Sequence, residues 1–216
     1  MKNIILSFCI LLISSGAIFA QRDPSALQLL DQMSAKYQKM SGFKANFDYT
    51  FENSAEGINE KMSGEIAVKG NKYKLNIGGQ EIFNNGDVIW TYLDLDGVKE
   101  VTINYFEPSE EELTPSNIYT IYKEGYNYKL LPEKKEGAIT YQYVELTPTS
   151  KSSPFKKVIL QIEKDTKNLK SWKITDETGG TFSYIVNNFQ PNLNLKDADF
   201  NFDVKKYPGV EVIDLR

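Results

Sequence analysis

The pattern that dominates the chain is an alternation of apolar and polar residues. It begins at residues 43–52, FKANFDYTFE, where Phe43, Ala45, Phe47 and Tyr49 share one face and polar side chains share the other. A period of two predicts a strand with one buried face. The same pattern returns, between short turns, at residues 61–70, 71–86, 87–103, 126–134, 138–148, 155–164, 169–177 and 180–189. We therefore predict a meander of about ten or eleven antiparallel strands.

One stretch before the strands has a helical period. From Leu27 to Met40, apolar residues recur at intervals of three and four, which places them on a single stripe of a helix. Asp23 is suited to the N-cap, with Pro24 at the first helical position. Gly42 is expected to end the helix in the manner of a C-terminal glycine.

The longest interruption of the strand pattern is EPSEEELTPSNIYTIYKEG, residues 107–125. Ser109 and Glu112 have the spacing of a capping box, but Pro115 would interrupt a helix that began there. We predict a second short helix from about Pro115 to Tyr122. A long interruption of this kind is also a candidate for a mobile element.

An antiparallel sheet of this size has to curl or close, because strands twist and unpaired edges are costly. The pattern leaves three architectures open: a closed barrel, a half-closed barrel with a helical lid, and a two-sheet sandwich. The chain contains 13 Tyr and 12 Phe, many of them on the predicted apolar face. A packed core is the simpler explanation of that face. The alternative is a hydrophobic ligand site, because the inward side chains are large and few helices are available to cover them.

The first twenty residues, MKNIILSFCILLISSGAIFA, differ from the rest in composition. Lys2 precedes an apolar run that ends at Ile13, and small residues follow as far as Ala20, which is typical of a secretory signal peptide. A membrane anchor is the rival interpretation, but the run is short for a hydrocarbon layer about 30 Å thick. We therefore predict a cleaved signal peptide at residues 1–20, a single domain at residues 21–216 and a periplasmic location.

The predicted mature chain contains neither cysteine nor histidine, since Cys9 lies in the signal peptide and the chain has no histidine. This excludes disulfides, catalytic triads that use histidine, and zinc sites with the usual nitrogen or sulfur ligands. Secretion without cysteine suits a bacterial periplasm. The net charge is −4, and basic and acidic residues are interspersed, so no basic stripe for nucleic acid is present. We expect a monomer that binds no metal, cofactor or nucleic acid.

Paired carboxylates are the remaining candidates for catalysis: Asp94 with Asp96, the run at residues 110–112, and Asp197 with Asp199. A glycosidase needs two carboxylates that face each other across a cleft, and the pattern does not predict this geometry. Asp94 and Asp96 flank a predicted hairpin turn, where Asp is common for backbone reasons. The stretch DLDG is similar to the start of a calcium loop, but the later ligands are out of register. We therefore expect no catalytic residue.

Several motifs in a fixed order give the chain a family resemblance. The N-terminal helix leads into MSGFKANFDYTF and then SGEIAVKGNKYKL. The most specific segment is IFNNGDVIWTYLDLDGVKEVTI, in which an apolar pair, a turn, an aliphatic–Trp–x–Tyr strand and a second strand follow one another. KVILQIEKDTKNLKSWKITDETGGTFSYIVNNFQPN and ADFNFDVKKYPGVEVIDL complete the order. Over nearly the whole mature chain, these motifs resemble the periplasmic outer-membrane lipoprotein carrier family, the LolA type.

The resemblance implies an incomplete antiparallel barrel closed by helices that act as a lid. It implies a periplasmic carrier that takes the acyl chains of lipoproteins, or other lipids, from the inner to the outer membrane. The implied partners are an inner-membrane lipoprotein-releasing transporter and an outer-membrane acceptor. Members of the family place an Arg that holds the lid after the second strand. Lys69 matches the basic residue before it, but Gly70 stands at the place of that Arg, so the latch is expected to differ here.

A lipid carrier gains about 0.8 kcal/mol from each buried methylene, so part of one acyl chain is enough for useful binding. The residues expected to line the cavity are Phe47, Phe51, Tyr73, Leu75, Val88, Trp90, Tyr92, Trp172 and Phe182. The residues expected in the lid are Leu30, Met33, Tyr37, Ile118, Ile121 and Tyr122. The alternative function is a periplasmic lipid-binding sensor or interaction module on the same scaffold. An enzyme that depends on carboxylates, Tyr, Lys or Ser is the third hypothesis.

Overall fold

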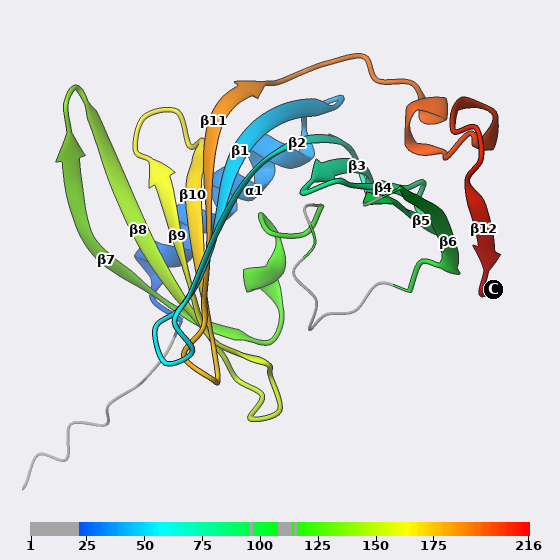
Figure 1. Ribbon diagram of the computed structural model, residues 1–216. Helices are drawn as coiled ribbons and strands as arrows, with labels where there is room; N and C mark the ends of the chain where they lie inside the picture. Colours follow the sequence, from blue (N-terminus) through cyan, green and yellow to red (C-terminus); the bar gives the residue numbers. More distant parts are fainter. Residues whose placement is uncertain (1–21, 96, 108–113, 115) are drawn as a thin grey trace, which may run out of the picture.

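The computed structural model describes residues 22–95, 97–107, 114 and 116–216 (Figure 1). Its main element is a single sheet of twelve strands in the order β12-β6-β5-β4-β3-β2-β1-β11-β10-β9-β8-β7. All neighbouring strands are antiparallel except β12, which runs parallel to β6. Because β12 and β7 end the order without pairing to each other, the sheet is open. The prediction of an incomplete antiparallel barrel is therefore confirmed, and the closed barrel and the two-sheet sandwich are excluded.

The strand predictions agree with the structure along most of the chain, and the observed number is twelve. The first strand extends over the whole alternating stretch that opened the pattern. The short β4 lies at the end of the predicted segment 71–86, and β12, near the C-terminus, is an additional strand. The bounds are β1 Phe43–Asn53, β2 Ile58–Lys69, β3 Lys72–Ile77, β4 Gln80–Asn84, β5 Val88–Leu95, β6 Val98–Tyr105, β7 Tyr126–Glu136, β8 Ile139–Pro148, β9 Phe155–Glu163, β10 Leu169–Asp176, β11 Thr181–Gln190 and β12 Glu211–Asp214.

The long helix α1 spans Pro24–Gln38 and begins as predicted. The carboxylate of Asp23 accepts hydrogen bonds from the backbone N–H of Ser25 at 2.8 Å and from that of Leu130 at 3.1 Å. The cap therefore also ties the start of the helix to strand β7. The predicted end at Gly42 is wrong, because the helix stops four residues earlier. A Cβ at Gly42 would lie 3.1 Å from the carbonyl oxygen of Val68, so this glycine permits close approach of two backbones.

The predicted second helix, from about Pro115 to Tyr122, is also wrong. The described residues from 116 to 120 form turns, and one turn of 3-10 helix, η1, spans Ile121–Lys123. Asn117 Oδ1 accepts a hydrogen bond from the backbone N–H of Thr114 at 2.8 Å, and Thr120 Oγ1 donates one to the carbonyl of Asn117 at 3.0 Å. These local side-chain bonds compete with those of a regular helix. Pro115, the capping-box residues and the predicted signal peptide lie outside the described residues.

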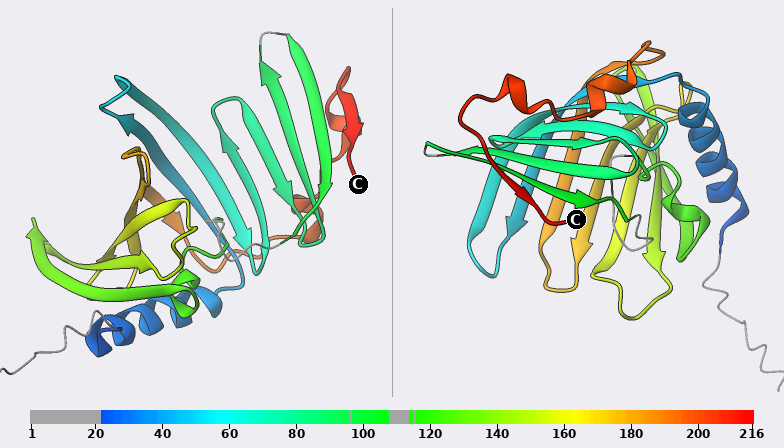
Figure 2. Two further views of the ribbon diagram at one scale, coloured as in Figure 1. Left: turned by 90° about the horizontal axis from the view of Figure 1, so that it is seen from below. Right: turned by 90° about the vertical axis from the view of Figure 1, so that its right-hand side faces the viewer.

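The sheet has two faces with different covers. The inner face carries Phe47, Ile66 and Leu75, and both α1 and the segment 116–123 pack against it. The outer face carries Lys74 and Phe83 on β3 and β4, and the C-terminal segment 191–216 covers that part of it. Figure 2 shows that this segment, with its short 3-10 turns η2 (Asp197–Phe200) and η3 (Val204–Lys206), lies at the β3–β6 end of the molecule.

Each face has its own hydrophobic core. The inner core is large and joins α1 to strands from β1 to β10, with fully buried side chains that include Leu30, Met33, Leu146 and Leu160. The outer core is a small cluster of Phe83, Tyr92, Val101 and Phe202. A sheet with apolar side chains on both faces near β4–β6 needs a cover on each side, and the C-terminal segment supplies the second one.

Two runs of consecutive hairpins build the sheet, β1 to β6 and β7 to β11. They are joined where β1 pairs with β11, from Lys44 opposite Gln190 to Glu52 opposite Thr181. We call this pairing the seam. No helix in the described part of the chain is long and apolar enough to cross a membrane.

Candidate functional site

The inner face is hollowed beneath residues 114 and 116–120, here called the covering segment. One part of this hollow, here called the apolar lobe, has a volume of about 370 Å³. Its walls come from strands β1, β2, β3, β4, β10 and β11, and Thr114 and Ile118 lie above them. Its lining residues are Phe47, Tyr49, Met62, Ile66, Leu75, Ile77, Gly78, Gln80, Thr114, Ile118, Trp172, Ile174 and Tyr184.

Aromatic rings that straddle the seam form one wall of the apolar lobe. The rings of Trp172 and Tyr184 stack with centroids 4.8 Å apart and planes 12° from parallel, and Tyr49 lies 5.2 Å from Tyr184. Burial, followed by the nearby Tyr49, raises the pKa of Tyr184 to about 12. Phe47 lies directly opposite Gly64 on the neighbouring strand, and its ring occupies the space that a side chain there would need.

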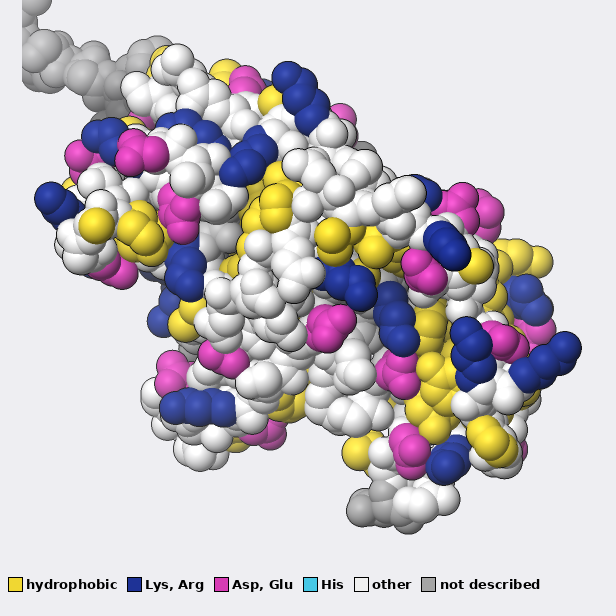
Figure 3. Space-filling model, turned by 90° about the horizontal axis from the view of Figure 1, so that it is seen from above, with side chains coloured by type: hydrophobic (Ala, Val, Ile, Leu, Met, Phe, Trp, Pro, Cys, Tyr) yellow, Lys and Arg dark blue, Asp and Glu magenta, His cyan; other side chains and the backbone are white. Residues whose placement is uncertain are grey.

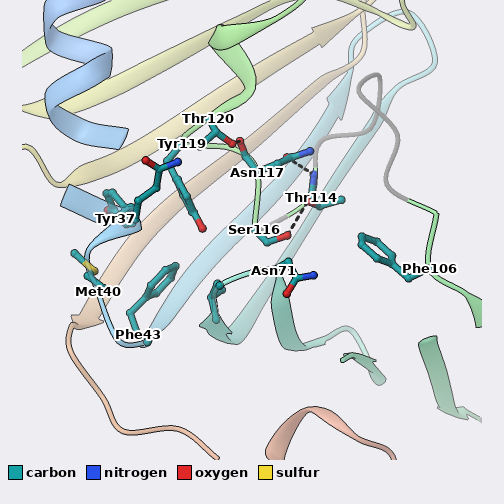
Figure 4. Close-up of a pocket in the computed structure, with 14 residues that line it drawn as sticks. Tyr37, Met40, Phe43, Asn71, Phe106, Thr114, Ser116, Asn117, Tyr119 and Thr120 are labelled. Carbon is teal, nitrogen blue, oxygen red and sulfur yellow. Dashed lines mark hydrogen bonds between the residues drawn. The ribbon is translucent and has the colours of Figure 1, made fainter. Parts of the chain in front are cut away.

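A second hollow opens on the other side of the covering segment and is here called the polar lobe (Figure 4). Its volume is about 410 Å³. Aromatic rings of Tyr37, Phe43 and Tyr119 form part of its wall, while amides and hydroxyls from the segment 114–120 and from the β2–β3 turn form the rest. The hydroxyls of Thr114 and Ser116 lie 3.1 Å apart. This lobe therefore offers neutral hydrogen-bonding groups beside an aromatic surface.

A third, smaller space of about 40 Å³ adjoins both lobes. It shares Phe47, Ile66, Ile118 and Trp172 with the apolar lobe. With the polar lobe it shares Tyr37, Phe43 and Tyr119. The three spaces therefore adjoin one another beside Ile118 and Tyr119, and we refer to them together as the cavity.

Two contacts hold the covering segment on α1. The rings of Tyr37 and Tyr119 stack with centroids 5.1 Å apart, and the hydroxyl of Tyr122 donates a hydrogen bond of 2.6 Å to Asp31. The hydroxyl of Tyr37 in turn accepts a hydrogen bond from the backbone N–H of Leu169 at 3.0 Å. Burial raises the pKa of both Tyr37 and Tyr122 above its ordinary value. Both tyrosines are therefore neutral hydrogen-bonding groups at physiological pH.

The structure places the predicted cavity residues at different distances from this space. Phe47, Leu75 and Trp172 line it. Tyr73 is on the inner face but is 5% exposed within the core. Phe51 and Phe182 stack on each other at 4.7 Å on the same face, beyond the lining of the cavity.

The predicted inward position of Val88, Trp90 and Tyr92 is wrong. Trp90 pairs with Phe83, which pairs with Lys74, so all three side chains are on the outer face. Val88 and Tyr92 share that side because strand residues alternate. Trp90 and Tyr92 pack with the cluster of Phe83 and Phe202. In the stretch VIWTYL, most residues on both faces of the strand are apolar. Its pattern therefore could not decide which face of the strand points to the cavity.

The predicted lid residues divide into two groups. Tyr37 and Ile118 reach the cavity. Leu30, Met33, Ile121 and Tyr122 are buried in the core, where they fix α1 and the covering segment to the sheet. The prediction missed Tyr119 and Tyr184. Tyr184 lies on the phase of β11 that contains Phe182, so the alternation of that strand would have been a sufficient signal.

The residues at the predicted latch position, Lys69 and Gly70, have other contacts than the covering segment. Lys69 Nζ donates hydrogen bonds to the carbonyl oxygen of Leu195 at 2.9 Å and to Asp197 at 2.8 Å, so it ties the C-terminal segment to the sheet. Lys72 also contacts Asp197, at 3.2 Å. Gly70 lines the polar lobe and has a φ of +60°, a conformation that favours glycine.

The described lining of both lobes contains amides, hydroxyls, aromatic rings and aliphatic groups, but no charged side chain. The carboxylates considered for catalysis are elsewhere: Asp94 accepts a hydrogen bond from Tyr92 on the outer face, and Asp197 pairs with the two lysines above. Asp96 and the run at residues 110–112 lie outside the described residues. In the described part of the chain, no group of three or more His, Cys, Asp or Glu side chains could hold a metal ion.

The charged side chains lie on the surface, where both signs are mixed. Figure 3 shows Lys and Arg interspersed with Asp and Glu over the face seen from above, and hydrophobic side chains gathered toward the β3–β6 end. The described lining of the cavity could hold a ligand by apolar burial and by hydrogen bonding.

The chain matches the family model described as "Outer membrane lipoprotein carrier protein LolA" over residues 38–203. No curated protein matches it. Among solved structures, an uncharacterized conserved protein from Thermus thermophilus has a TM-score of 0.58 and 14% identity, with 88% of this chain and 99% of that chain covered. Lipoprotein LppX from Mycobacterium tuberculosis has a TM-score of 0.51 and 16% identity, covering 81% and 100%. A LolA superfamily protein from Nitrosomonas europaea has a TM-score of 0.45 and 14% identity, covering 83% and 98%.

Proposed function

We propose, because the chain belongs to the outer membrane lipoprotein carrier protein LolA family, that it is a carrier of lipid acyl chains in the bacterial periplasm. The observation that supports this most directly is the apolar lobe, which has aromatic and aliphatic walls and lies between the sheet and a separate covering segment. Its volume falls within the range of roughly 300–1,000 Å³ that is usual for ligand pockets. The cargo proposed is the acyl portion of lipoproteins, moved from the inner to the outer membrane.

The mechanism is reversible burial without covalent chemistry. Each methylene that enters the lobe contributes about 0.8 kcal/mol, so affinity rises with the buried length of the chain. Release requires the covering segment to move, which would break the Tyr37–Tyr119 stack and the Tyr122–Asp31 hydrogen bond that link it to α1. An inner-membrane releasing transporter and an outer-membrane acceptor are the partners that this proposal requires.

The two tryptophans provide a direct test, because Trp172 lines the apolar lobe and Trp90 packs on the outer face. Trp90→Phe leaves Trp172 as the single tryptophan. When delipidated protein of this variant is titrated with an acylated lipopeptide, the emission of Trp172 is expected to shift to the blue and to saturate. Trp172→Phe is the matched control, and its remaining Trp90 emission should stay constant. Absence of a saturable change in the Trp172-only protein would overturn the carrier proposal.

Co-purification separates a carrier from the sensor or interaction module considered as the alternative. Protein isolated gently from periplasm should retain lipids or several different lipoproteins, identified by mass spectrometry. A single regulatory protein in the same preparation, without lipid, would support the interaction module and count against the carrier.

A further inference from the structure

Methionine supplies the oxidisable sulfur atoms of the predicted mature chain. Residues 21–216 contain no cysteine, and their methionines are Met33, Met40 and Met62. Met33 is 0% exposed in the inner core, whereas Met40 and Met62 are both partly exposed. These two thioethers line the cavity, Met40 in the polar lobe and Met62 in the apolar lobe. A reagent that attacks methionine sulfur therefore meets this protein at its candidate binding site.

Met62 lies at the rim of the apolar lobe, in the first half of β2. Its neighbours in the strand, Lys61 and Ser63, are exposed. Met62 is directly opposite Tyr49 of the cavity wall. Its Sδ packs on the β3–β4 turn, since a Cβ at Gly78 would lie only 2.7 Å from it. The sulfur therefore contacts bare backbone on that side, and no second side chain encloses it there.

Peroxides and hypohalous acids oxidise a thioether by transfer of one oxygen atom. With hydrogen peroxide, a lone pair of the sulfur attacks one oxygen, an S–O bond forms and the O–O bond breaks. The proton of the transferred oxygen passes to the other oxygen, which leaves as water. The sulfur is oxidised by two electrons, and the peroxide is reduced by the same two. Methionine sulfoxide reductases reverse the change with two thiols, which become a disulfide while the sulfoxide oxygen leaves as water.

The oxidised side chain does not suit an apolar wall. A thioether is flexible and apolar, whereas the sulfoxide is polar and chiral. A sulfoxide oxygen pressed against an acyl chain loses its hydration and gains no hydrogen bond, which costs free energy. At Met62 this cost opposes the burial that drives acyl binding. At Met40 the sulfoxide lies instead beside the amides and hydroxyls of the polar lobe.

We propose that Met62 is an oxidation-sensitive modification site that lowers the affinity of the cavity for acyl chains. A peroxide or a hypohalous acid forms the sulfoxide, and a methionine sulfoxide reductase restores the thioether and the affinity. This inference rests on the proposed function, because its effect is measured as acyl binding to the same cavity.

Peptide mass spectrometry after mild hydrogen peroxide treatment measures the order of oxidation. Met62 is expected to form its sulfoxide at least about tenfold faster than Met33, because an enclosed sulfur reacts only when the core opens. The same spectra establish that Trp172 and Tyr184 are unmodified. Equal rates at Met62 and Met33 would overturn the proposal.

Isothermal titration calorimetry with a dipalmitoylated lipopeptide measures the effect on binding, and each protein is compared with its own untreated form. Peroxide should weaken binding at least about fivefold in the parent and in Met40→Leu, but less than about twofold in Met62→Leu. Reductase treatment should reverse the loss in the parent. If the untreated parent binds and its oxidised form binds equally well, the inference is overturned and the carrier proposal stands. An equal loss in Met62→Leu would also overturn the inference. If the untreated parent does not bind, the carrier proposal fails first.

A permanently polar side chain gives a second readout that needs no oxidant. Met62→Gln should weaken lipopeptide binding at least about threefold, because an amide in the wall carries the same desolvation cost. Lys61→Gln is the matched control, since Lys61 is the exposed neighbour on the outer face of β2, and its affinity should change less than about twofold. Circular dichroism checks that both variants are folded. Unchanged affinity in folded Met62→Gln, or an equal loss in Lys61→Gln, would overturn the proposal.

Discussion

At the scale of single residues, Gly64 controls the shape of the apolar lobe. A Cβ at this position would lie 2.4 Å from the Cζ of Phe47 and 2.8 Å from the carbonyl oxygen of Asn76. We expect Gly64→Ala to lower the free energy of unfolding by about 1–3 kcal/mol, because it overpacks the site and pushes the Phe47 ring into the cavity. Urea unfolding measures the loss, and the affinity for an acyl probe should fall with it.

A double-mutant cycle checks that Phe47 is the cause. In a Phe47→Leu background the ring that meets the new methyl is absent. The cost of Gly64→Ala should then fall by about 1 kcal/mol, since residues in direct contact are coupled. An unchanged cost would assign the strain to the carbonyl of Asn76 instead.

At alkaline pH, the free energy of unfolding should depend on the ionisation of Tyr184. Burial raises its pKa from 10.0 to about 12 in the folded protein. In the unfolded chain the Tyr184 phenol loses its proton at a lower pH than in the folded protein. The free energy of unfolding is therefore unaffected below pH 10 and falls as the pH rises toward 12. Between about pH 9 and about pH 11.5, Tyr184→Phe should lose less stability than the parent, by on the order of 1–2 kcal/mol.

The measurement is a series of urea titrations across that pH range. Tyr105→Phe is a suitable control, because Tyr105 is 65% exposed at the edge of β6. Its pH dependence should match that of the parent. If Tyr184→Phe also matched the parent, the phenol would have to be solvated rather than enclosed by Trp172 and Tyr49.

At the scale of elements, the covering segment depends on its attachment to α1. We expect Tyr122→Phe to remove the hydrogen bond to Asp31 and to cost about 1 kcal/mol, since a bond to a charged acceptor is lost while water hydrates the exposed carboxylate. Hydrogen–deuterium exchange should accelerate mainly in residues 116–124. Asp31→Asn keeps an acceptor and should have a smaller effect. A uniform rise in exchange over the sheet would show that this bond stabilises the whole fold and not the segment.

The sequence predicts an element well where its apolar residues all lie on one face of a helix or a strand. The helix from Asp23 and the alternation of β1 are such cases, since apolar residues occupy a single stripe or face. In β5 the residues of both faces are apolar, so the strand itself does not decide which way Trp90 points. Its side is set by packing with the cluster that contains Phe202, which is distant in the sequence. The segment near Asn117 failed as a helix because its local side-chain hydrogen bonds form turns.

At the scale of the whole molecule, the C-terminal segment acts as an outer cover that is independent of the cavity. Phe202 is 9% exposed, and its ring lies 5.6 Å from that of Phe83 and 4.4 Å from that of Tyr207. Phe202→Ala should destabilise the protein by about 3 kcal/mol. The affinity of the folded protein for an acyl probe should stay within twofold, because the inner face is unchanged.

Thermal unfolding and probe titration at low temperature measure the two quantities separately. Val204→Ala is the control for the same segment, since Val204 is 47% exposed and should cost less than about 0.5 kcal/mol. A parallel loss of stability and affinity in Phe202→Ala would mean that the two faces are coupled through the sheet.

At this scale the residue pattern predicted a large antiparallel sheet with one long helix, because its alternation and turns recur along the chain. It left three architectures open, and the family resemblance indicated the incomplete barrel. The parallel pairing of β12 with β6 could not be predicted. Four residues, Glu211–Asp214, are too short for a distinct period, and their place is fixed by the packing of the preceding segment on Phe83 and Tyr92.

The seam between β1 and β11 has a consequence for the order of folding. Most neighbouring strands form hairpins that are close along the chain, but the seam joins strands from opposite ends of it. Closing so long a loop is entropically costly and slows folding. Tyr49 and Tyr184 face each other across the seam and belong to the cavity wall. We therefore expect the binding site to be the last part of the protein to form. Acyl-probe binding, measured by stopped-flow fluorescence, should return only in the slowest phase of refolding.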